Sequence, residues 1–213
     1  MPVILKKNIL HASVVGIWEI KEDESYFMDR IKLTEEEKVQ LSAIKGKRRV
    51  HWLCSRHLLH LITNETRRRA CLKDEFGKPH LHDSQLSISF SHSDDLVAVG
   101  MSRHLIGIDI QARVEKITRI RHKFVNEDEL PGEDHDEITH LHWIWGAKEA
   151  AFKAYGRKQI DFLKNMKFKY DDEDSFHLSL SKPGERSFDF TGKLEQWGEY
   201  HFVYLIENSK NEA

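Results

Sequence analysis

The sequence is poor in cysteine and contains no long apolar run. Cys54 and Cys71 are its only cysteines among 213 residues. Two cysteines cannot form the disulfide framework of a small secreted protein, so a reducing compartment is the simpler interpretation. Charged residues interrupt the most apolar stretches within about ten residues, well short of the ~20 that a membrane-spanning helix needs. These absences predict a cytoplasmic protein without a membrane span.

The run from Ile9 to Ile20 also lacks the features of a signal peptide. It follows Lys6 and Lys7 but contains Glu19 and has no clear cleavage site. A β-strand is therefore the better interpretation of this run.

The chain has no excess of charge of one sign. It carries 35 acidic and 33 basic residues, for a formal net charge of −2. This balance argues against a general nucleic-acid binder, because such proteins carry a strong positive excess. With 39% hydrophobic residues, 213 residues suffice for one large domain or two small ones.

Strand and helix patterns follow one another in an order that predicts an α+β protein with antiparallel sheets. Thr34 and Glu37 form a capping box, which predicts a helix that runs to about Ile44. The other predicted helices are 47–62, 114–124 and 135–155; the predicted strands are 14–20, 86–91, 96–101, 106–111, 165–170, 175–180, 186–191 and 199–206, with a turn at 92–95.

Two acidic residues stand where a core-facing strand and a helix are predicted. Asp109 lies in the alternating segment Gly107-Ile108-Asp109-Ile110-Gln111, and Glu149 borders the apolar stripe of the long helix. Two carboxylates from separate elements can bind a hard cation such as Mg²⁺. Lys148 and Lys153 flank Glu149, and lysines beside such a cation can bind phosphates.

A plainer interpretation exists for each half of this pattern. Glu149 and Lys153 are four residues apart, and most such pairs are exposed salt bridges worth about 0.2–0.5 kcal/mol. Asp109 needs a partner when buried, which a nearby Lys or Arg can supply as well as a metal.

Four blocks together carry a specific resemblance. In order they are Phe76-Gly77-Lys78-Pro79, Ile88-Ser89-Phe90-Ser91-His92-Ser93, Gly107-Ile108-Asp109-Ile110 and Trp145-x-x-Lys148-Glu149-x-x-x-Lys153. The chain resembles the 4′-phosphopantetheinyl transferases of the larger, two-halved class that includes the surfactin-synthetase activator. The arginine-bearing helix at 48–56 also fits, and the resemblance spans about residues 45–160.

The resemblance implies an enzyme that moves the phosphopantetheine arm of coenzyme A to a serine of an acyl or peptidyl carrier protein. Such enzymes use Mg²⁺ and release adenosine 3′,5′-bisphosphate. It also implies a monomer of two similar α/β subdomains, related by a pseudo-two-fold axis, with the active site between them. We expect residues 1–104 to contact the nucleotide end and residues 105–213 to carry the metal and catalytic residues.

The resemblance also implies roles for individual residues. Asp109, Gln111 and Glu149 are the expected metal ligands, and Glu149 or a metal-bound water takes the serine proton. Lys153 is the expected contact of the pyrophosphate, with Lys148 nearby. The residues expected at the nucleotide end are Arg49, Arg56, Lys78, Ser91 and His92, and Arg48 or Lys47 can replace Arg49 because the helix register is loose.

Gln111 departs from the family pattern, which usually has glutamate two residues after the aspartate. An amide oxygen can still ligate Mg²⁺ or orient its water, but one negative charge is lost. We therefore expect weaker metal binding. The departure leaves open an alternative, a coenzyme A-binding module of the same fold with weakened catalysis.

The expected carrier is small and acidic, so a basic surface should receive it. The stripe Arg113, Lys116, Arg119 and Lys123, with Arg121 nearby, follows the Asp109 strand and is the candidate. An ordinary solvated helix face is an equally good interpretation. The run Arg67-Arg68-Arg69 is interpreted as a solvated loop, and a nucleic-acid binder using 45–49 and 67–69 is the third hypothesis.

Overall fold

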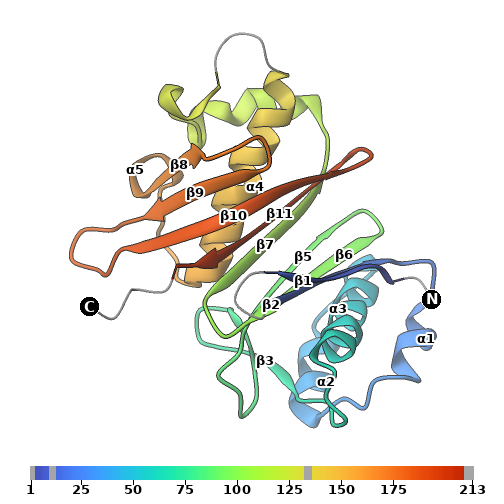
Figure 1. Cartoon of the computed structure of the whole chain (residues 1–213). Coiled ribbons are helices and arrows are strands. Elements are labelled where there is room, and N and C mark those ends of the chain that lie inside the picture. The colour runs from blue at the N-terminus through green and yellow to red at the C-terminus, as the bar shows by residue number, and fades with distance from the viewer. Residues whose placement is uncertain (1–2, 10–12, 132–135, 209–213) are drawn as a thin grey trace. The chain divides into compact units, whose positions relative to one another are not determined.

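The chain folds into two compact units. The structure, a computed structural model, describes residues 3–9, 13–131 and 136–208. The first unit comprises Met1–Arg103 and the second His104–Ala213. Each unit has its own sheet and its own apolar core (Figure 1).

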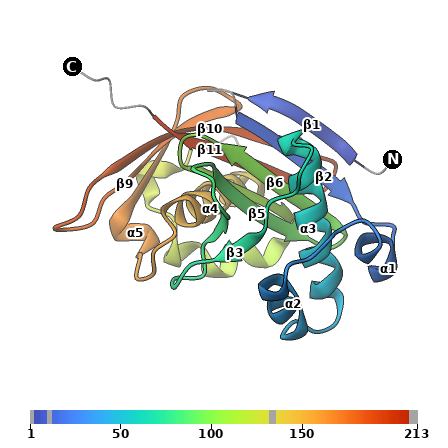
Figure 2. The ribbon, with the colours of Figure 1, turned by 90° about the horizontal axis from the view of Figure 1, so that it is seen from below.

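The first unit combines six strands with three helices. Its elements are β1 (Val3–Ile9), β2 (Ser13–Glu19), α1 (Glu24–Met28), α2 (Glu35–Ser42), α3 (Lys47–Thr63), β3 (Cys71–Lys73), β4 (Pro79–Leu81), β5 (Ser87–Ser93) and β6 (Leu96–Ser102). The strands pair antiparallel in the order β1-β2-β6-β5-β4-β3. The three helices lie on one side of the sheet formed by β1, β2 and β6 (Figure 2).

Helix α3 is the main support of the first unit. Its residues Leu53, Leu58 and Ile62 are buried with Trp18 of β2 and Ile88 of β5 in one apolar cluster. Each fully buried side chain of this size contributes about 1.5–3 kcal/mol. The helix ends at Asn64, whose left-handed conformation (φ 54°) stops the helical backbone.

The second unit combines five strands with one long helix. Its elements are β7 (Ile106–Ala112), η1 (Glu115–Lys123), η2 (Glu127–Glu129), α4 (Glu137–Tyr155), α5 (Phe162–Asn165), β8 (Met166–Tyr170), β9 (Ser175–Leu180), β10 (Phe188–Trp197) and β11 (Tyr200–Glu207). The strands pair antiparallel in the order β7-β11-β10-β9-β8. Leu141, Ile144 and Ala147 of α4 are buried with Phe176 and Val203 of the sheet.

The α+β fold with antiparallel sheets is confirmed. The capping box of Thr34 and Glu37 is present as predicted. The segment 114–124, predicted as a helix, forms the 3₁₀ helix η1. The predictions omitted the short elements α1, β3, β4 and α5 and the edge strand β1. Residues 10–12 of the predicted N-terminal strand region and residue 135 of the predicted long helix lie outside the described residues.

Among the helices described here, none combines the length and apolar character needed to cross a membrane.

Candidate active site

Strand β7 and helix α4 approach each other unusually closely, and this contact builds the site. A Cβ atom on Gly107 would lie only 1.9 Å from the carbonyl oxygen of Ala150, so no side chain fits there. Side chains alternate along a strand, so Asp109 and Gln111 share the face of Gly107 and also point toward α4. The requirement for glycine at 107 therefore follows from the same packing that brings Asp109 beside the helix.

Lys153 of α4 is bonded to Asp109. Its Nζ donates to Asp109 Oδ1 at 2.7 Å and to the carbonyl oxygen of Ile108 at 3.1 Å. Asp109 is 7% exposed, and a carboxylate this buried needs such a partner. The predicted helical pair of Glu149 with Lys153 is thus replaced by a pair across two elements that are far apart in sequence.

Glu149 shares this environment. Burial raises the pKa of its carboxyl group above the usual range, and the negative charge of Asp109 raises it further, while Lys153 acts in the opposite direction. The charges of Asp109 and Lys153 therefore both act on the Glu149 carboxyl group. A bound cation would reverse the effect and favour the charged form of Glu149.

Gln111 is fixed by a bond to the same helix. Its Nε2 donates to the carbonyl oxygen of His142 at 3.0 Å. Only the nitrogen of the amide can donate to a carbonyl, so this bond also fixes which side of the amide carries Oε1. Oε1 makes no recorded hydrogen bond in the described part of the chain, and it is the ligand atom that Gln111 can offer.

These oxygen atoms suit a hard divalent cation. No cluster of three or more His, Cys, Asp or Glu side chains able to bind a metal occurs among the described residues. Mg²⁺, however, is commonly bound through one or two carboxylates plus the phosphates of a substrate. Asp109 and Glu149 are carboxylates of this kind, and Gln111 could add an amide oxygen. They would be a poor site for Zn²⁺, which prefers nitrogen and sulfur ligands.

Lys148 has a different role from the one predicted. Its side chain is fully buried, and Nζ donates to Glu129 Oε2 at 2.7 Å and to the carbonyl oxygens of Phe124 and Phe162. Glu129 in turn accepts from the backbone of Phe168 and Asn126. All three donors of the ammonium group are used, so Lys148 joins α4 to η2 and α5 and cannot reach a substrate.

Arg49 joins α3 to α1 and to the end of α2. Its guanidinium forms a two-pronged pair with Glu24 of α1, at 2.9 Å and 2.7 Å, and donates to the carbonyl oxygens of Leu41 and Ile44. These bonds occupy the guanidinium of Arg49 in this structure, and its contact with the nucleotide stays a prediction. Lys47 pairs with Asp95 at 2.9 Å, whereas Arg48 is exposed and has no recorded partner in the described residues.

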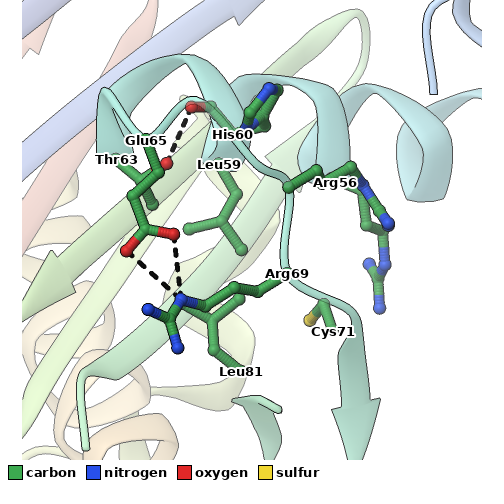
Figure 3. Close-up of a pocket in the computed structure, with 9 residues that line it drawn as sticks. Arg56, Leu59, His60, Thr63, Glu65, Arg69, Cys71 and Leu81 are labelled. Atoms are coloured by element: carbon green, nitrogen blue, oxygen red, sulfur yellow. Dashed lines mark hydrogen bonds and ion pairs between the residues drawn. The ribbon is translucent and has the colours of Figure 1, made fainter. Parts of the chain in front are cut away.

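Arg56 lies inside the first unit. It is 4% exposed, with its guanidinium carbon 4.0 Å from the Trp52 ring centre and 5.1 Å from that of Phe90. Burial lowers the pKa of its guanidinium, and Nε has no hydrogen-bond partner. The side chain lines a small pocket with Arg68, Arg69, His60 and Cys71, shown in Figure 3. A buried cation in such a pocket is suited to an anion.

The arginine run at 67–69 is a loop with Arg67 and Arg69 exposed, as predicted, but the Arg68 side chain is largely buried. Arg68 forms a buried ion pair with Glu37, the N3 residue of the α2 capping box. Arg69 pairs with Glu65 at 2.9 Å, as Figure 3 shows. Two of the three charges are therefore balanced by acids, which weakens the nucleic-acid hypothesis.

Ser91 and His92 are strand residues rather than turn residues. Strand β5 runs to Ser93, and the turn to β6 consists of Asp94 and Asp95. Neighbouring side chains on a strand point to opposite faces. His92 lies on the face of Ile88 and Phe90, toward α3, and Ser91 on the other. Lys78 is half-buried in the turn before β4, where Asp74 Oδ1 accepts from its backbone N–H at 2.8 Å.

Comparison with known proteins finds a match in the second unit. Residues 105–205 match the family described as the 4′-phosphopantetheinyl transferase superfamily. The second unit is therefore similar to that superfamily. A curated relative, "4′-phosphopantetheinyl transferase gsp" of Aneurinibacillus migulanus, is 28% identical over 109 residues. That match spans 49% of this chain and 46% of the relative, less than half the length of either.

The resemblance predicted from the four blocks is confirmed at family level. The blocks containing Asp109 and Glu149 lie inside the superfamily match, and those at 76–79 and 88–93 lie outside it. The close contact between Gly107 and Ala150 lies inside the matched region.

The basic stripe of the second unit contains two arginines that pair with acids and three exposed residues for which no pair is recorded in the described chain. Arg113 pairs with Asp136 at 2.9 Å, and this bond lowers the pKa of Asp136 to about 2. Arg121 pairs with Glu127 and Glu137. Lys116, Arg119 and Lys123 are exposed on η1, and no partner is recorded for them in the described chain. In a 3₁₀ helix residues three apart align, so Lys116, Arg119 and His122 form one row.

His51 of α3 was not singled out by the sequence. Its ring stacks on that of His92, with centres 4.6 Å apart and planes 25° apart. His51 lies among the apolar positions of the helix, so its spacing gives no sign of a polar role. Only the fold brings α3 and β5 together.

Proposed function

We propose that the protein transfers the 4′-phosphopantetheine arm of coenzyme A to a serine of an apo acyl or peptidyl carrier protein. The observation that supports this best is the bond between Lys153 and Asp109, whose charges both act on Glu149 of the same helix as Lys153. Two carboxylates and an ammonium group are the elements needed to hold a divalent cation and a pyrophosphate together.

Each residue has a proposed task at the reacting phosphate. Asp109, Glu149 and Gln111 would hold Mg²⁺, which when bound supplies charge neutralisation at the pyrophosphate. Lys153 would release Asp109 as a cation takes that carboxylate, and its ammonium group would then hold a pyrophosphate oxygen. Glu149 would accept the proton of the carrier serine as its oxygen attacks the phosphorus next to pantetheine. Adenosine 3′,5′-bisphosphate would leave.

The nucleotide end is proposed to meet residues of the first unit. Lys78, Ser91 and His92 remain candidates there, and Arg48 takes the place of Arg49. Arg56 can contribute only to an anion that enters its pocket, because its other contacts are aromatic rings, a hydroxyl group and backbone.

A second candidate function is a coenzyme A-binding module with weakened catalysis. Gln111 favours it, because an amide replaces a negatively charged metal ligand. Asp109, Glu149 and Lys153 oppose it, because a binding module has no need of a proton acceptor.

The experiment that separates these functions uses the full chain with coenzyme A, Mg²⁺ and a panel of apo carrier proteins from fatty-acid, polyketide and peptide assembly. The carriers are then weighed by mass spectrometry. A carrier that gains one phosphopantetheine supports the transferase. Binding of coenzyme A, measured by calorimetry, without modification of any carrier would support the module instead.

Gln111→Glu should lower the Mg²⁺ concentration needed for half-maximal rate. A carboxylate cannot donate to the carbonyl oxygen of His142, so it would turn from the helix backbone toward the cation. We expect a shift of about tenfold, equivalent to about 1.4 kcal/mol. The measurement is a Mg²⁺ titration of initial rates. An unchanged or higher requirement would reject Gln111 as a ligand.

The proposed carrier-binding surface is the exposed part of the basic stripe. Carrier proteins are expected to be acidic, and the row of Lys116, Arg119 and His122 with Lys123 offers positive charge on one face of η1. Arg113 and Arg121 are held by acids of the same unit and contribute less.

Reversal of two charges tests this surface. Lys116→Glu with Arg119→Glu should raise KM for the carrier by about tenfold or more at low salt and leave KM for coenzyme A unchanged, since exposed charges act mainly on encounter. A matched control is Lys167→Glu with Lys169→Glu, exposed on β8 of the same unit. Equal effects from both pairs, or equal effects on both substrates, would contradict docking at η1.

A further inference from the structure

The β5–β6 hairpin ends in a tight turn of two residues, one of which has a left-handed backbone conformation. Ser93 pairs with Leu96, so only Asp94 and Asp95 form the turn. Asp94 has φ 50°, which is a left-handed conformation. Glycine adopts this conformation freely, Asn and Asp adopt it less readily, and other residues adopt it rarely. Such conformations persist where surrounding contacts hold them.

Three contacts from outside the hairpin are among those that hold this turn. His51 Nε2 lies 2.8 Å from the carbonyl oxygen of Asp94. Lys47 pairs with the Asp95 carboxylate at 2.9 Å, and the backbone N–H of Ile20 donates to the Asp95 carbonyl at 2.8 Å. Two of the three come from the first two turns of α3, so this helix end sets the position of the turn.

His51 makes the contact that also reaches a candidate site residue. It is 8% exposed, and its ring stacks face to face on exposed His92, the second-last residue of β5. A carbonyl only accepts, so Nε2 of His51 carries the proton in this bond. Nδ1 is then the lone-pair nitrogen, and it is buried with no hydrogen-bond partner among the residues that the structure describes.

The bond from His51 Nε2 to the Asp94 carbonyl oxygen distinguishes this residue from an apolar packing residue. A phenyl or aliphatic side chain could fill the same place but could not donate this bond. What an imidazole adds is the simultaneous bond to Asp94 and the flat face against His92. Together they fix both the end of β5 and the plane of the His92 ring.

We propose that His51 is a positioning residue that orients His92 toward the 3′-phosphate of coenzyme A. The inference rests on the proposed function, in which His92 meets the nucleotide end. A histidine held in one plane by stacking directs its ring N–H groups at a fixed point, and its hydrogen bond to a phosphate there would be stronger than one to a neutral hydroxyl group. His51 thus contributes to selection of coenzyme A over 3′-dephospho-coenzyme A.

Calorimetric binding of the two nucleotides to the full chain tests this role without need for turnover. His51→Ala should weaken binding of coenzyme A by about tenfold, or about 1.4 kcal/mol, and leave binding of 3′-dephospho-coenzyme A within about twofold. His51→Phe keeps a flat ring, whereas His51→Gln keeps a donor but no ring. The loss of affinity for coenzyme A should therefore be smaller in His51→Phe than in His51→Gln. His92→Ala added to His51→Ala should cause no further loss, since both act through one ring.

His57→Ala is the matched control on the same helix. His57 packs in an aromatic cluster with Trp18 and Phe27, and its loss should lower stability without a change in the ratio of the two affinities. Equal weakening of both nucleotides by His51→Ala, or an unchanged ratio, would overturn the positioning role and leave the proposed function standing. A wild-type chain that binds neither nucleotide would overturn both.

Discussion

Asp109→Asn and Glu149→Gln should each nearly abolish phosphopantetheine transfer. Loss of the Asp109 charge removes a proposed metal ligand and the partner of Lys153, and metal stabilisation of transition-state charge is worth several kcal/mol. A positioned general base contributes about 10²–10⁴-fold, so Glu149→Gln should lower kcat by a factor in that range. Initial rates of carrier modification at saturating Mg²⁺ measure both effects.

The control for this pair is Glu173→Gln, an exposed acid in the β8–β9 turn of the same unit, which should leave the rate unchanged. Both site variants should keep the fold, because each amide conserves the shape of the carboxyl group it replaces. The amide oxygen introduced by Asp109→Asn can also still accept from Lys153. Rates within threefold of wild type for either variant would remove that residue from the reaction.

Lys148→Met should destabilise the second unit by about 3–5 kcal/mol. Removal of one partner from a buried ion pair leaves the other charge uncompensated, and Glu129 is as deeply buried as Lys148. Denaturant unfolding monitored by tryptophan fluorescence measures the change, since Trp143 and Trp145 lie on the same helix. Addition of Glu129→Gln should restore part of the loss, because the remaining buried group is then neutral.

Lys164→Met provides the comparison. Lys164 is 83% exposed and 3.6 Å from Asp161, so its loss should change stability by less than about 0.5 kcal/mol. At temperatures where Lys148→Met is folded, its affinity for coenzyme A should equal that of wild type. A variant of normal stability with lost coenzyme affinity would restore Lys148 to the binding site and contradict its structural role.

The sequence was sufficient to predict the elements that build the site. Alternation in 106–111 and helical spacing in 138–152 predicted β7 and α4, and Gly107 signalled a close approach to the strand. These are local periodicities, which depend little on what the element later packs against. The motif spacing then identified the superfamily, and the match over residues 105–205 supports it.

The partners of the charged residues could not be predicted in the same way. Lys148 and Lys153 lie five residues apart on one helix, yet one is buried on Glu129 and the other reaches Asp109. Arg49 pairs with Glu24, 25 residues away. Each of these pairs depends on which loop or helix packs against a given face. The periodicity of the sequence does not predict that packing. His51 was missed for the same reason.

Short elements were also missed by the prediction. Strands β3 and β4 have three residues each, too few to show alternation. The 3₁₀ geometry of η1 was missed because apolar spacing at 117, 120 and 124 fits an α-helix as well. The division of roles between the two units, and their pseudo-two-fold relation, stay predictions.

One measurement tests the central claim most directly, which is that Asp109 and Glu149 share one divalent cation. Mn²⁺ binding to the wild-type chain, in the presence of coenzyme A, can be followed by electron paramagnetic resonance without any carrier. We expect one bound Mn²⁺ per chain, weakened by about tenfold or more in Asp109→Asn and equally in Glu149→Gln, with competition by Mg²⁺. Wild-type affinity in either variant would show that the two carboxylates do not bind a common ion.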